Sequence, residues 1–442
     1  MRRPAPTFFQ HAAAVGLLFG ACSTDPAKES VSGGDTAPST DGADGSGADP
    51  TTLRYYGDIQ PIMARSCVGC HAEGGVGGFS LQTYAEVSAW ASPIARSVEA
   101  RTMPPWTAAK DCSSYQGDFS LSEEEIAKIV EWADGGAPEG DPANMGELPP
   151  AFEPTTLDRV DMEIEVPFDY APVNTPDDYR CFLVEWPYEE QVWVTGYHIQ
   201  PQNLTIAHHV IPFLIDPESV PAMQALDDAD PSPGYPCYGG PGGDIDTLQR
   251  MRWLGSWAPG SGAQILPEGT GIRVQPGSMV ALQMHYYNPA NFPDTDRTKV
   301  ALKVETEPQG WADIQPWTDV AWVLGVGMDI PAHTEGVTHE FRYTATPGDA
   351  FRIHTAGLHM HTLGRSAKMW VEHADGTESC LLHEDSWDFN WQRGYALTEP
   401  VSVSAGDTVV LQCTWDNTTD ADAAWGEGTG DEMCLGITTL TQ

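Results

Sequence analysis

The chain has 442 residues, of which 41% are hydrophobic and 10% aromatic, so it can build substantial cores and is not a disordered protein. The 63 Asp and Glu residues outweigh the 22 Lys and Arg residues and give a formal net charge of −41. Such a charge repels phosphate backbones and anionic lipid surfaces, so nucleic acid is not an expected partner.

The first 22 residues have the pattern of an export signal. Arg2 and Arg3 precede an apolar segment, residues 12–21, that is too short to span a bilayer. The segment ends in Phe-Gly-Ala-Cys22, which resembles a bacterial lipoprotein cleavage box. We therefore expect an exported protein of the periplasm or cell envelope, attached to the membrane only through a lipid anchor on Cys22, with plain secretion as the alternative. Residues 23–52 are mostly Ser, Thr, Asp, Gly, Ala and Pro and predict a flexible linker.

Residues 53–148 predict a small α-helical domain around Cys67-Val-Gly-Cys70-His71. C-x-x-C-H is the attachment pattern of haem c, in which both thiols bind the haem and the histidine lies under the iron. A zinc half-site would need a second Cys/His pair, and a redox C-x-x-C would need an α/β pattern that this sequence lacks. Met103, between Thr and two prolines, is the expected second axial ligand, unless it only packs.

The same domain should end with a helix. Ser122 and Glu125 form a capping-box pattern, apolar residues recur at helical spacing from Ile126 to Ala133, and Gly135 follows as a stop signal. The segment resembles the C-terminal helix of small c-type cytochromes.

Residues 155–442 predict a β-rich body. Short runs of Val, Ile, Trp, Tyr and Thr alternate with clusters of Pro, Gly, Asp and Asn, which is typical of antiparallel sandwiches. The segment is long for one sandwich, so we expect two in tandem, residues 155–305 and 306–442, with the seam near residues 306–317. The expected fold class is mainly β: two antiparallel sandwiches preceded by the helical domain.

His359 and His361 are the first candidate metal ligands of this body. Because one residue separates them in a β-like run, both should point to the same face of a strand and reach one metal ion. Met433, in Gly-Asp-Glu-Met-Cys, is the best candidate for a third ligand. Two imidazoles and a thioether suit copper, Cu(I) in particular, better than zinc, calcium or magnesium. The alternative is a histidine pair on the surface or in the core.

His208, His209 and His285 could form a second site. His208 and His209 are adjacent, so on a regular strand they face opposite ways. Both can bind one ion only if the strand bends or if they use different ring nitrogens. His285, in a separate run, would complete a three-nitrogen site, whereas the alternative is that one of the adjacent pair faces the core.

The motifs AHH, QMHY, HMH and DEMC follow one another in an order that resembles the copper type II ascorbate-dependent monooxygenases, the family of peptidylglycine α-hydroxylating monooxygenase and dopamine β-monooxygenase. The resemblance implies two jelly-roll-like sandwiches with one copper ion in each and a solvent-filled cleft between them. It implies an electron-relaying copper on His208, His209 and His285. It implies a catalytic copper, where dioxygen binds, on His359, His361 and Met433.

Six cysteines remain beside Cys22, Cys67 and Cys70, and an even remainder in an exported chain predicts disulfides. The resemblance implies the pairs Cys413–Cys434, next to Met433, and Cys181–Cys237. Cys112 and Cys380 are left over, and their pairing would tie the helical domain to the second sandwich.

The expected function is therefore copper-dependent hydroxylation of a C–H bond of a small organic substrate by dioxygen. We expect haem to relay electrons to the three-histidine copper, replacing or supplementing ascorbate or another external donor. Peptide-amidating members hold a substrate carboxylate with an Arg and a Tyr where this chain has Gly357 and Ile437, so a peptidylglycine substrate is disfavoured, and an amine and a neutral compound both stay open. The alternatives are a non-enzymatic, lipid-anchored haem and copper electron-transfer or copper-binding protein, and an adhesin-like β protein with incidental histidines.

Overall fold

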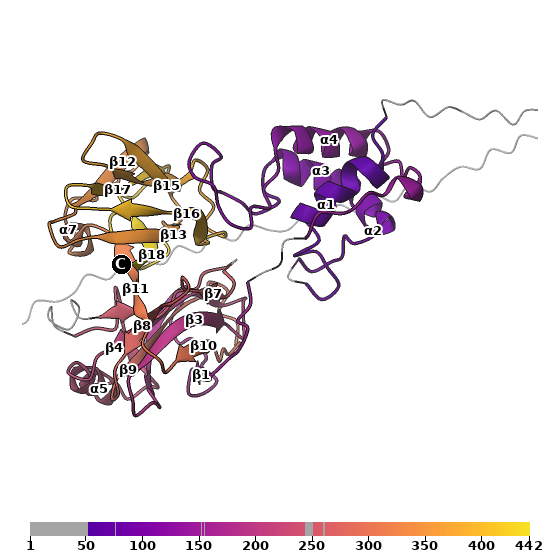
Figure 1. Cartoon of the computed structure of the whole chain (residues 1–442). Coiled ribbons are helices and arrows are strands. Elements are labelled where there is room, and N and C mark those ends of the chain that lie inside the picture. Colours follow the sequence, from indigo (N-terminus) through magenta and orange to yellow (C-terminus); the bar gives the residue numbers. More distant parts are fainter. Residues whose placement is uncertain (1–51, 76, 152, 154, 244–250, 260) are drawn as a thin grey trace, which may run out of the picture. The chain divides into compact units, whose positions relative to one another are not determined.

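The computed structural model describes residues 52–75, 77–151, 153, 155–243, 251–259 and 261–442. In these residues the chain is mainly β, as predicted, with a group of short helices before the first strand (Figure 1). The expected export signal with Cys22, and nearly all of the expected linker at 23–52, lie outside the described residues. Within the described ranges, no helix is both long enough and apolar enough to cross a bilayer.

Capping boxes begin two of the helices that precede the first strand. The helical elements before that strand are the π-helical turn Tyr55–Ile59, α1 (Gln60–Ser66), α2 (Tyr84–Ala89), α3 (Ala91–Glu99), α4 (Glu123–Asp134) and the 3-10 turn Pro142–Asn144. The predicted capping box at α4 is present, because the Ser122 side chain accepts a bond from the Glu125 N–H and the Glu125 carboxylate accepts one from the Ser122 N–H. Ile129 and Trp132 of α4 pack against Tyr55 in one small core.

Two facing layers of strands enclose the first β core. Their strands are β1 (Met162–Glu165), β2 (Asp177–Glu185), β3 (Val192–Gln200), β4 (Ala207–Ile215), β5 (Tyr235–Pro236), β6 (Arg252–Trp253), β7 (Gln264–Ile265), β8 (Thr270–Val274), β9 (Met279–Tyr287) and β10 (Lys299–Glu305), with helix α5 (Val220–Ala229) after β4. Both layers belong to one 14-stranded sheet, in which one stretch has the order β1-β10-β3-β8, with β7 beside β3, and another has the order β6-β4-β9-β2-β5. Val194, Val210 and Leu282, which come from three of these strands, are fully buried between the layers, as in a sandwich.

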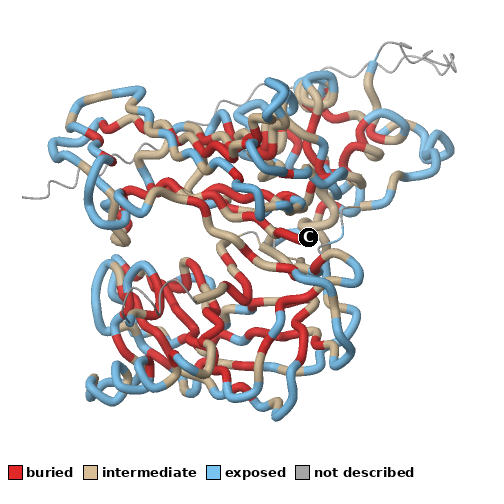
Figure 2. Tube along the Cα trace, turned by 60° about the vertical axis from the view of Figure 1, so that its left-hand side comes forward, coloured by how far each residue is buried: buried red, intermediate tan, exposed pale blue. Residues whose placement is uncertain are grey.

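A second pair of sheets encloses the second β core. Its strands are β11 (Gly310–Trp317), β12 (Thr334–Thr344), β13 (Phe351–His359), β14 (Gly364–Glu372), β15 (Glu378–Glu384), β16 (Tyr395–Val403), β17 (Thr408–Asn417) and β18 (Leu435–Thr441), with helix α7 (Val320–Val323) after β11. One sheet has the order β12-β17-β14-β15, and in the other β13 pairs with β16 and β18, and β18 with β11. Met360, Leu382 and Trp415 are fully buried between them. Figure 2 shows buried segments running through both groups of strands.

Strand β11 is shared by the two groups of sheets. Trp311 pairs with Gly271 of β8 in parallel, and farther along Trp317 pairs with Gly436 of β18. The segment predicted as the seam therefore contains a strand that hydrogen-bonds on both sides, and the exact domain limits stay a prediction.

The stretch between α3 and α4 packs on the second sandwich. Ala108 and Tyr115 belong to the second β core, and the Tyr115 hydroxyl donates to the Leu381 carbonyl at 3.1 Å. A disulfide joins Cys112 to Cys380. Part of residues 53–148, which are expected to form the helical domain, thus packs in the second core.

Candidate metal centres

His208, His209 and His285 lie together on β4 and β9. One ring nitrogen from each lies within 4.8 Å of the others. The pairing of β4 with β9 shifts register between Ala207 and His209, and such a β-bulge bends a strand and turns a side chain. This is the bend that two adjacent histidines need. His209 stands directly opposite His285, with 3.2 Å between their Nδ1 atoms.

Asp177 fixes the orientation of the His285 ring. The His285 Nε2–H donates to the Asp177 carboxylate at 2.8 Å, which leaves Nδ1 facing the other two histidines. Tyr179 stacks on the same ring, with 4.0 Å between centroids. Asp177 also accepts a 2.7 Å bond from the Thr429 hydroxyl, so one carboxylate joins the three-histidine group to the loop before Met433. No sequence pattern pointed to Asp177.

His359 and His361 lie at the end of β13, with their ring centroids 5.2 Å apart. Met360 between them is fully buried in the second core, as the alternation along a strand predicts. The His359 Nδ1–H donates to the Gln392 side-chain oxygen, and the His361 Nδ1–H donates to the Asp431 carbonyl at 3.0 Å. Both rings therefore keep Nε2 available for a metal ion.

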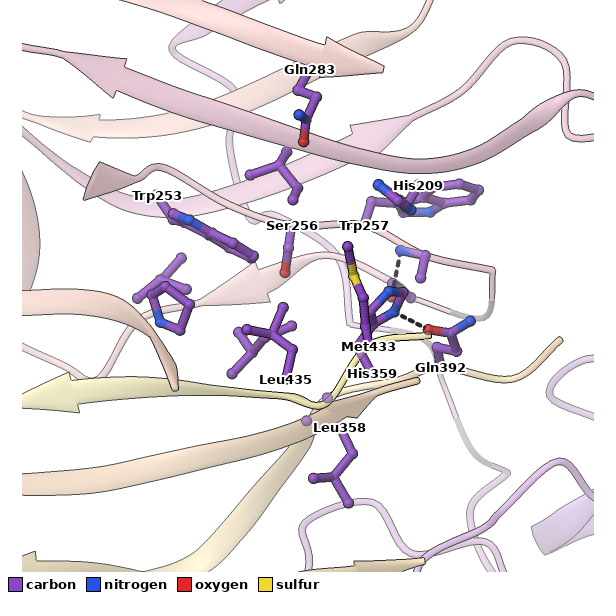
Figure 3. A pocket seen from close by; sticks show the side chains of 18 of the residues that line it. His209, Trp253, Ser256, Trp257, Gln283, Leu358, His359, Gln392, Met433 and Leu435 are labelled. Carbon is purple, nitrogen blue, oxygen red and sulfur yellow. Dashed lines mark hydrogen bonds between the residues drawn. The ribbon is translucent and has the colours of Figure 1, made fainter. Parts of the chain in front are cut away.

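Met433 is buried and stands next to His359 in Figure 3. The neighbouring Glu432 carboxylate accepts bonds from the His361 N–H at 2.9 Å, the Leu363 N–H at 2.6 Å and the Trp415 indole at 2.8 Å. Glu432 thus ties the backbone at Met433 to the backbone at His361. Sequence reasoning missed this role, although Glu432 stands inside the motif.

Three disulfides are present in the described chain, in the pairs that were expected. They join Cys413 to Cys434, Cys181 to Cys237 and Cys112 to Cys380. Cys434 follows Met433 directly, so the first of these bonds anchors the thioether segment to β17.

Burial keeps all five imidazoles neutral near pH 7. It lowers the pKa of His208 and of His361 to about 4 and that of His359 to about 3, and it holds the pKa of His209 and of His285 well below the ordinary value of 6.5. Among the described residues, His208 Nδ1 is buried without a hydrogen-bond partner. Neutral, clustered imidazoles with a thioether beside one pair are a donor set that fits copper.

The two ligand groups adjoin each other. The His209 and His359 rings have centroids 5.8 Å apart, although they come from different sandwiches. Phe389 stacks on His208 at 4.6 Å and lies 6.2 Å from His361. Phe389 thus contacts a histidine of each group, and the solvent-filled cleft implied by the resemblance stays a prediction.

A cavity of about 250 Å³ opens beside the same residues and is lined by His209, His359 and Met433 (Figure 3). Gly357 and Ile437 stand opposite each other on β13 and β18, and both line this cavity.

The C-x-x-C-H segment carries two free thiols, Cys67 and Cys70. His71 Nδ1 lies 3.3 Å from the Phe79 carbonyl oxygen, and donation to it leaves Nε2 available. Phe79 and Trp90 stack at 4.8 Å and are 38% and 44% exposed, an unusual exposure for large apolar rings. Two thiols without a disulfide, an available ring nitrogen and partly exposed aromatic rings are compatible with an attached haem, which stays a prediction. Met103 is 36% exposed, and its ligation stays a prediction.

Residues 392 and 393 link this segment to His359. The Arg393 guanidinium lies 5.1–5.4 Å from the ring centroids of Trp106, Phe119 and Tyr395. Burial raises the pKa of the Cys70 thiol, and the positive charge of the nearby Arg393 opposes that rise. The preceding residue, Gln392, bonds to His359. This link joins parts of the chain far apart in sequence and carries no motif.

The chain resembles known copper enzymes. The family model described as copper type II ascorbate-dependent monooxygenase, C-terminal domain, matches residues 324–437. Peptidyl-glycine alpha-amidating monooxygenase A of Xenopus laevis is 26% identical over 300 residues, which cover 66% of this chain and 29% of that protein. Dopamine beta-hydroxylase of Rattus norvegicus is 26% identical over 300 residues, covering 62% of this chain and 44% of that protein. The chain thus spans less than half the length of these relatives.

Solved structures resemble this chain only weakly. A structure of PNGF-II covers 66% of this chain and 64% of its own, at 11% identity and a TM-score of 0.25, which is too low to bear on fold or function.

Proposed function

We propose that the protein hydroxylates a C–H bond of a small organic substrate with dioxygen, because residues 324–437 match the copper type II ascorbate-dependent monooxygenase family and the chain is 26% identical to two named monooxygenase relatives. The observation that carries this proposal is the pairing of two different ligand groups side by side. Three imidazoles suit an ion that passes electrons, whereas two imidazoles and a thioether favour Cu(I) with an open position.

The residues of the chain have distinct tasks in this proposal. His208, His209 and His285 hold one ion, and His359, His361 and Met433 hold the other. Copper at these positions would supply one-electron transfer and the activation of dioxygen.

Neighbouring residues orient the proposed ligands. Asp177 fixes the tautomer of His285, and Gln392 fixes that of His359. Phe389 excludes water between the two groups, because its ring stacks on His208 and faces His361. The cavity beside His359 and Met433 holds the substrate. This scheme assigns no proton transfer to a protein side chain.

We further propose that haem c attached to Cys67 and Cys70 supplies electrons, with ascorbate or another external donor as its alternative or supplement. The Cys112–Cys380 bond supports this, because it fastens the adjoining chain to the second sandwich. The contacts of Gln392 and Arg393 favour entry of electrons on the His359 side, whereas the sequence had suggested the three-histidine group.

Export is supported by the three disulfides, which form in oxidising compartments. Lipid attachment at Cys22 in a bacterial envelope remains part of the proposal, since that residue lies outside the described chain.

Metal analysis combined with oxygen uptake tests the proposed function. We expect two copper ions and, from a pyridine haemochrome spectrum, one haem per chain. Oxygen uptake should yield a hydroxylated product and should be abolished in Met433→Ile, with haem retained. Met145→Ile is the control, since Met145 is 51% exposed and remote from the ligands. Metal binding without coupled oxygen uptake would favour the electron-transfer alternative, and a chain that binds no copper would favour the adhesin-like one.

A further inference from the structure

The walls of the cavity come from one face of three strands. Alternate residues of β4 line it (His209, Ile211 and Phe213), as do alternate residues of β13 (Thr355, Gly357 and His359) and of β18 (Leu435, Ile437 and Thr439). The residue nearest the proposed metal sites is the first of the series on β4 and β18 and the last of the series on β13. The four-residue span from His359 to Thr355 corresponds to about 13 Å of strand, so the cavity leads away from the metal sites along the strands.

Most of this wall is apolar. Beyond the aliphatic strand residues, Trp253 and Trp257 enter from the segment around β6 (Figure 3). Met251 of the same segment also lines the cavity. Ile437 lies across from Gly357, so neither of these facing positions offers a charge. A ligand that buries itself here must leave water for a hydrophobic surface, which is favourable for apolar groups and costly for ions.

Several neutral polar side chains interrupt the apolar wall, and Gln283 and Ser256 are two of them. Gln283 is only 2% exposed, and its amide donates to the Cys237 carbonyl at 3.3 Å, which turns the amide oxygen into the cavity (Figure 3). Ser256 also directs its hydroxyl into the cavity (Figure 3). Gln283 stands opposite Ile211, midway along the wall. A buried carbonyl oxygen of this kind calls for a hydrogen-bond donor on the ligand.

Two charged residues, Arg393 and Glu427, are among the residues that line the cavity. The Arg393 guanidinium is held among three aromatic rings, none of which lines the cavity. Glu427 is the one acidic residue of the lining in the described chain, and it accepts a bond from the Gly239 N–H. Burial raises the pKa of Glu427 to about 7, so much of it is uncharged near neutral pH.

From this lining we propose that the substrate is an uncharged, mainly hydrophobic molecule with one hydroxyl or amide N–H group that donates to Gln283. Its reacting carbon lies at the His359 and Met433 end of the cavity. That the bound molecule is a substrate rests on the proposed function. The chemical class of the ligand rests on the cavity alone.

Binding of matched probes to the metal-free full-length chain tests the class without any turnover. 2-Phenylethanol, 2-phenylethylamine and phenylacetate share a ring and a two-carbon chain and differ in charge. Calorimetry should show that 2-phenylethanol binds at least about tenfold more tightly than either ion, because an ion loses its hydration in an apolar cavity. Tightest binding of the amine, lost in Glu427→Gln, would overturn the proposal, and so would binding of none of the probes.

Substitution of Gln283 tests the hydrogen bond. Gln283→Leu should weaken 2-phenylethanol about fivefold and leave ethylbenzene, which has no donor, unchanged. Gln412→Leu, on β17 outside the cavity, is the matched control. Equal weakening of both probes would show a distorted cavity and contradict the assigned contact. If 2-phenylethanol binds as expected and copper-loaded protein still consumes no oxygen, the proposed function fails and the ligand class stands.

Discussion

The His209 and His359 rings lie with their centroids 5.8 Å apart, although one comes from β4 of the first sandwich and the other from β13 of the second. Each belongs to a different ligand group. Two metal ions held by these groups would therefore be neighbours, with Phe389 and the Asp177–Thr429 bond closing the space around them. The residues that orient the proposed ligands can therefore be tested by substitution, as the ligands can.

Asp177 should control copper affinity at the three-histidine group. Asp177→Ala removes the partner of His285 Nε2 and the bond to Thr429, so the ring loses its fixed tautomer. Copper affinity at this group should fall about 10–100-fold, measured by competition with a chelator. Asp158→Ala, which removes a surface partner of Lys303, should leave the affinity unchanged. Equal affinity in Asp177→Ala and the wild type would show that the carboxylate does not orient the ligand.

Gln392 should control copper affinity at the second ligand group, which consists of His359, His361 and Met433. Gln392→Leu takes away the acceptor of the His359 Nδ1–H and should lower copper affinity there about 10–100-fold. Gln392→Glu keeps an acceptor and should retain most of the affinity. Copper titrations that follow the two sites by electron paramagnetic resonance distinguish them. Loss at the three-histidine group instead would contradict the assignment.

Glu432 should be a major source of stability. Glu432→Ala leaves three buried N–H donors without their acceptor, at His361, Leu363 and Trp415. The expected loss is about 3 kcal/mol or more, since each unsatisfied buried donor costs about 1–3 kcal/mol. Thermal unfolding of the metal-free protein measures it, with the exposed Glu335→Ala as control. A melting temperature equal to that of the control would disprove the role.

The Cys112–Cys380 bond should couple the C-x-x-C-H segment to the second sandwich. Replacing both cysteines with Ser should cost about 2–4 kcal/mol of stability. In anaerobic stopped-flow, it should also slow the reoxidation of reduced haem by the copper-loaded protein. Replacing Cys181 and Cys237 with Ser removes a bond inside the first sandwich and should lower stability without that kinetic effect. Haem that is not reoxidised even in the wild type would end the relay proposal.

Glu384 should make the stability of the folded chain depend on pH. Burial raises the pKa of its carboxyl from the ordinary 4.5 to about 8, and the Thr107 hydroxyl donates to it at 2.8 Å. Between about pH 4.5 and 8 the folded chain keeps a proton that the unfolded chain releases, so stability falls as pH rises, by at most about 1.4 kcal/mol per pH unit.

Glu384→Gln should flatten this slope in melting curves taken from pH 5 to pH 8. The exposed Glu399→Gln should keep it. An unchanged slope in Glu384→Gln would place the pH dependence elsewhere.

The sequence was sufficient for features that depend on local spacing. Local geometry follows from two histidines in alternation, from a capping box before α4 and from β-type runs. The structure contains all three. The bend needed by His208 and His209 could be stated as a requirement, but its form as a β-bulge depends on the pairing of β4 with β9.

Long-range contacts could not be read from the sequence. Asp177, Gln392 and Phe389 belong to no motif, and their roles arise only when strands and loops distant in sequence meet. For the same reason, the packing of Tyr115 into the second core was not expected, because its own segment looks like a part of the helical domain. Such residues are selected by tertiary contacts rather than by periodicity.

The most direct test of the account is a single turnover of the reduced, copper-loaded chain with 2-phenylethanol under ¹⁸O₂, followed by mass spectrometry of the product. The account predicts a hydroxylated product with one ¹⁸O atom from the wild type and from Met145→Ile, and none from Met433→Ile. Labelled product in equal amounts from Met433→Ile, or oxygen consumed by the wild type with no label in the organic product, would contradict it.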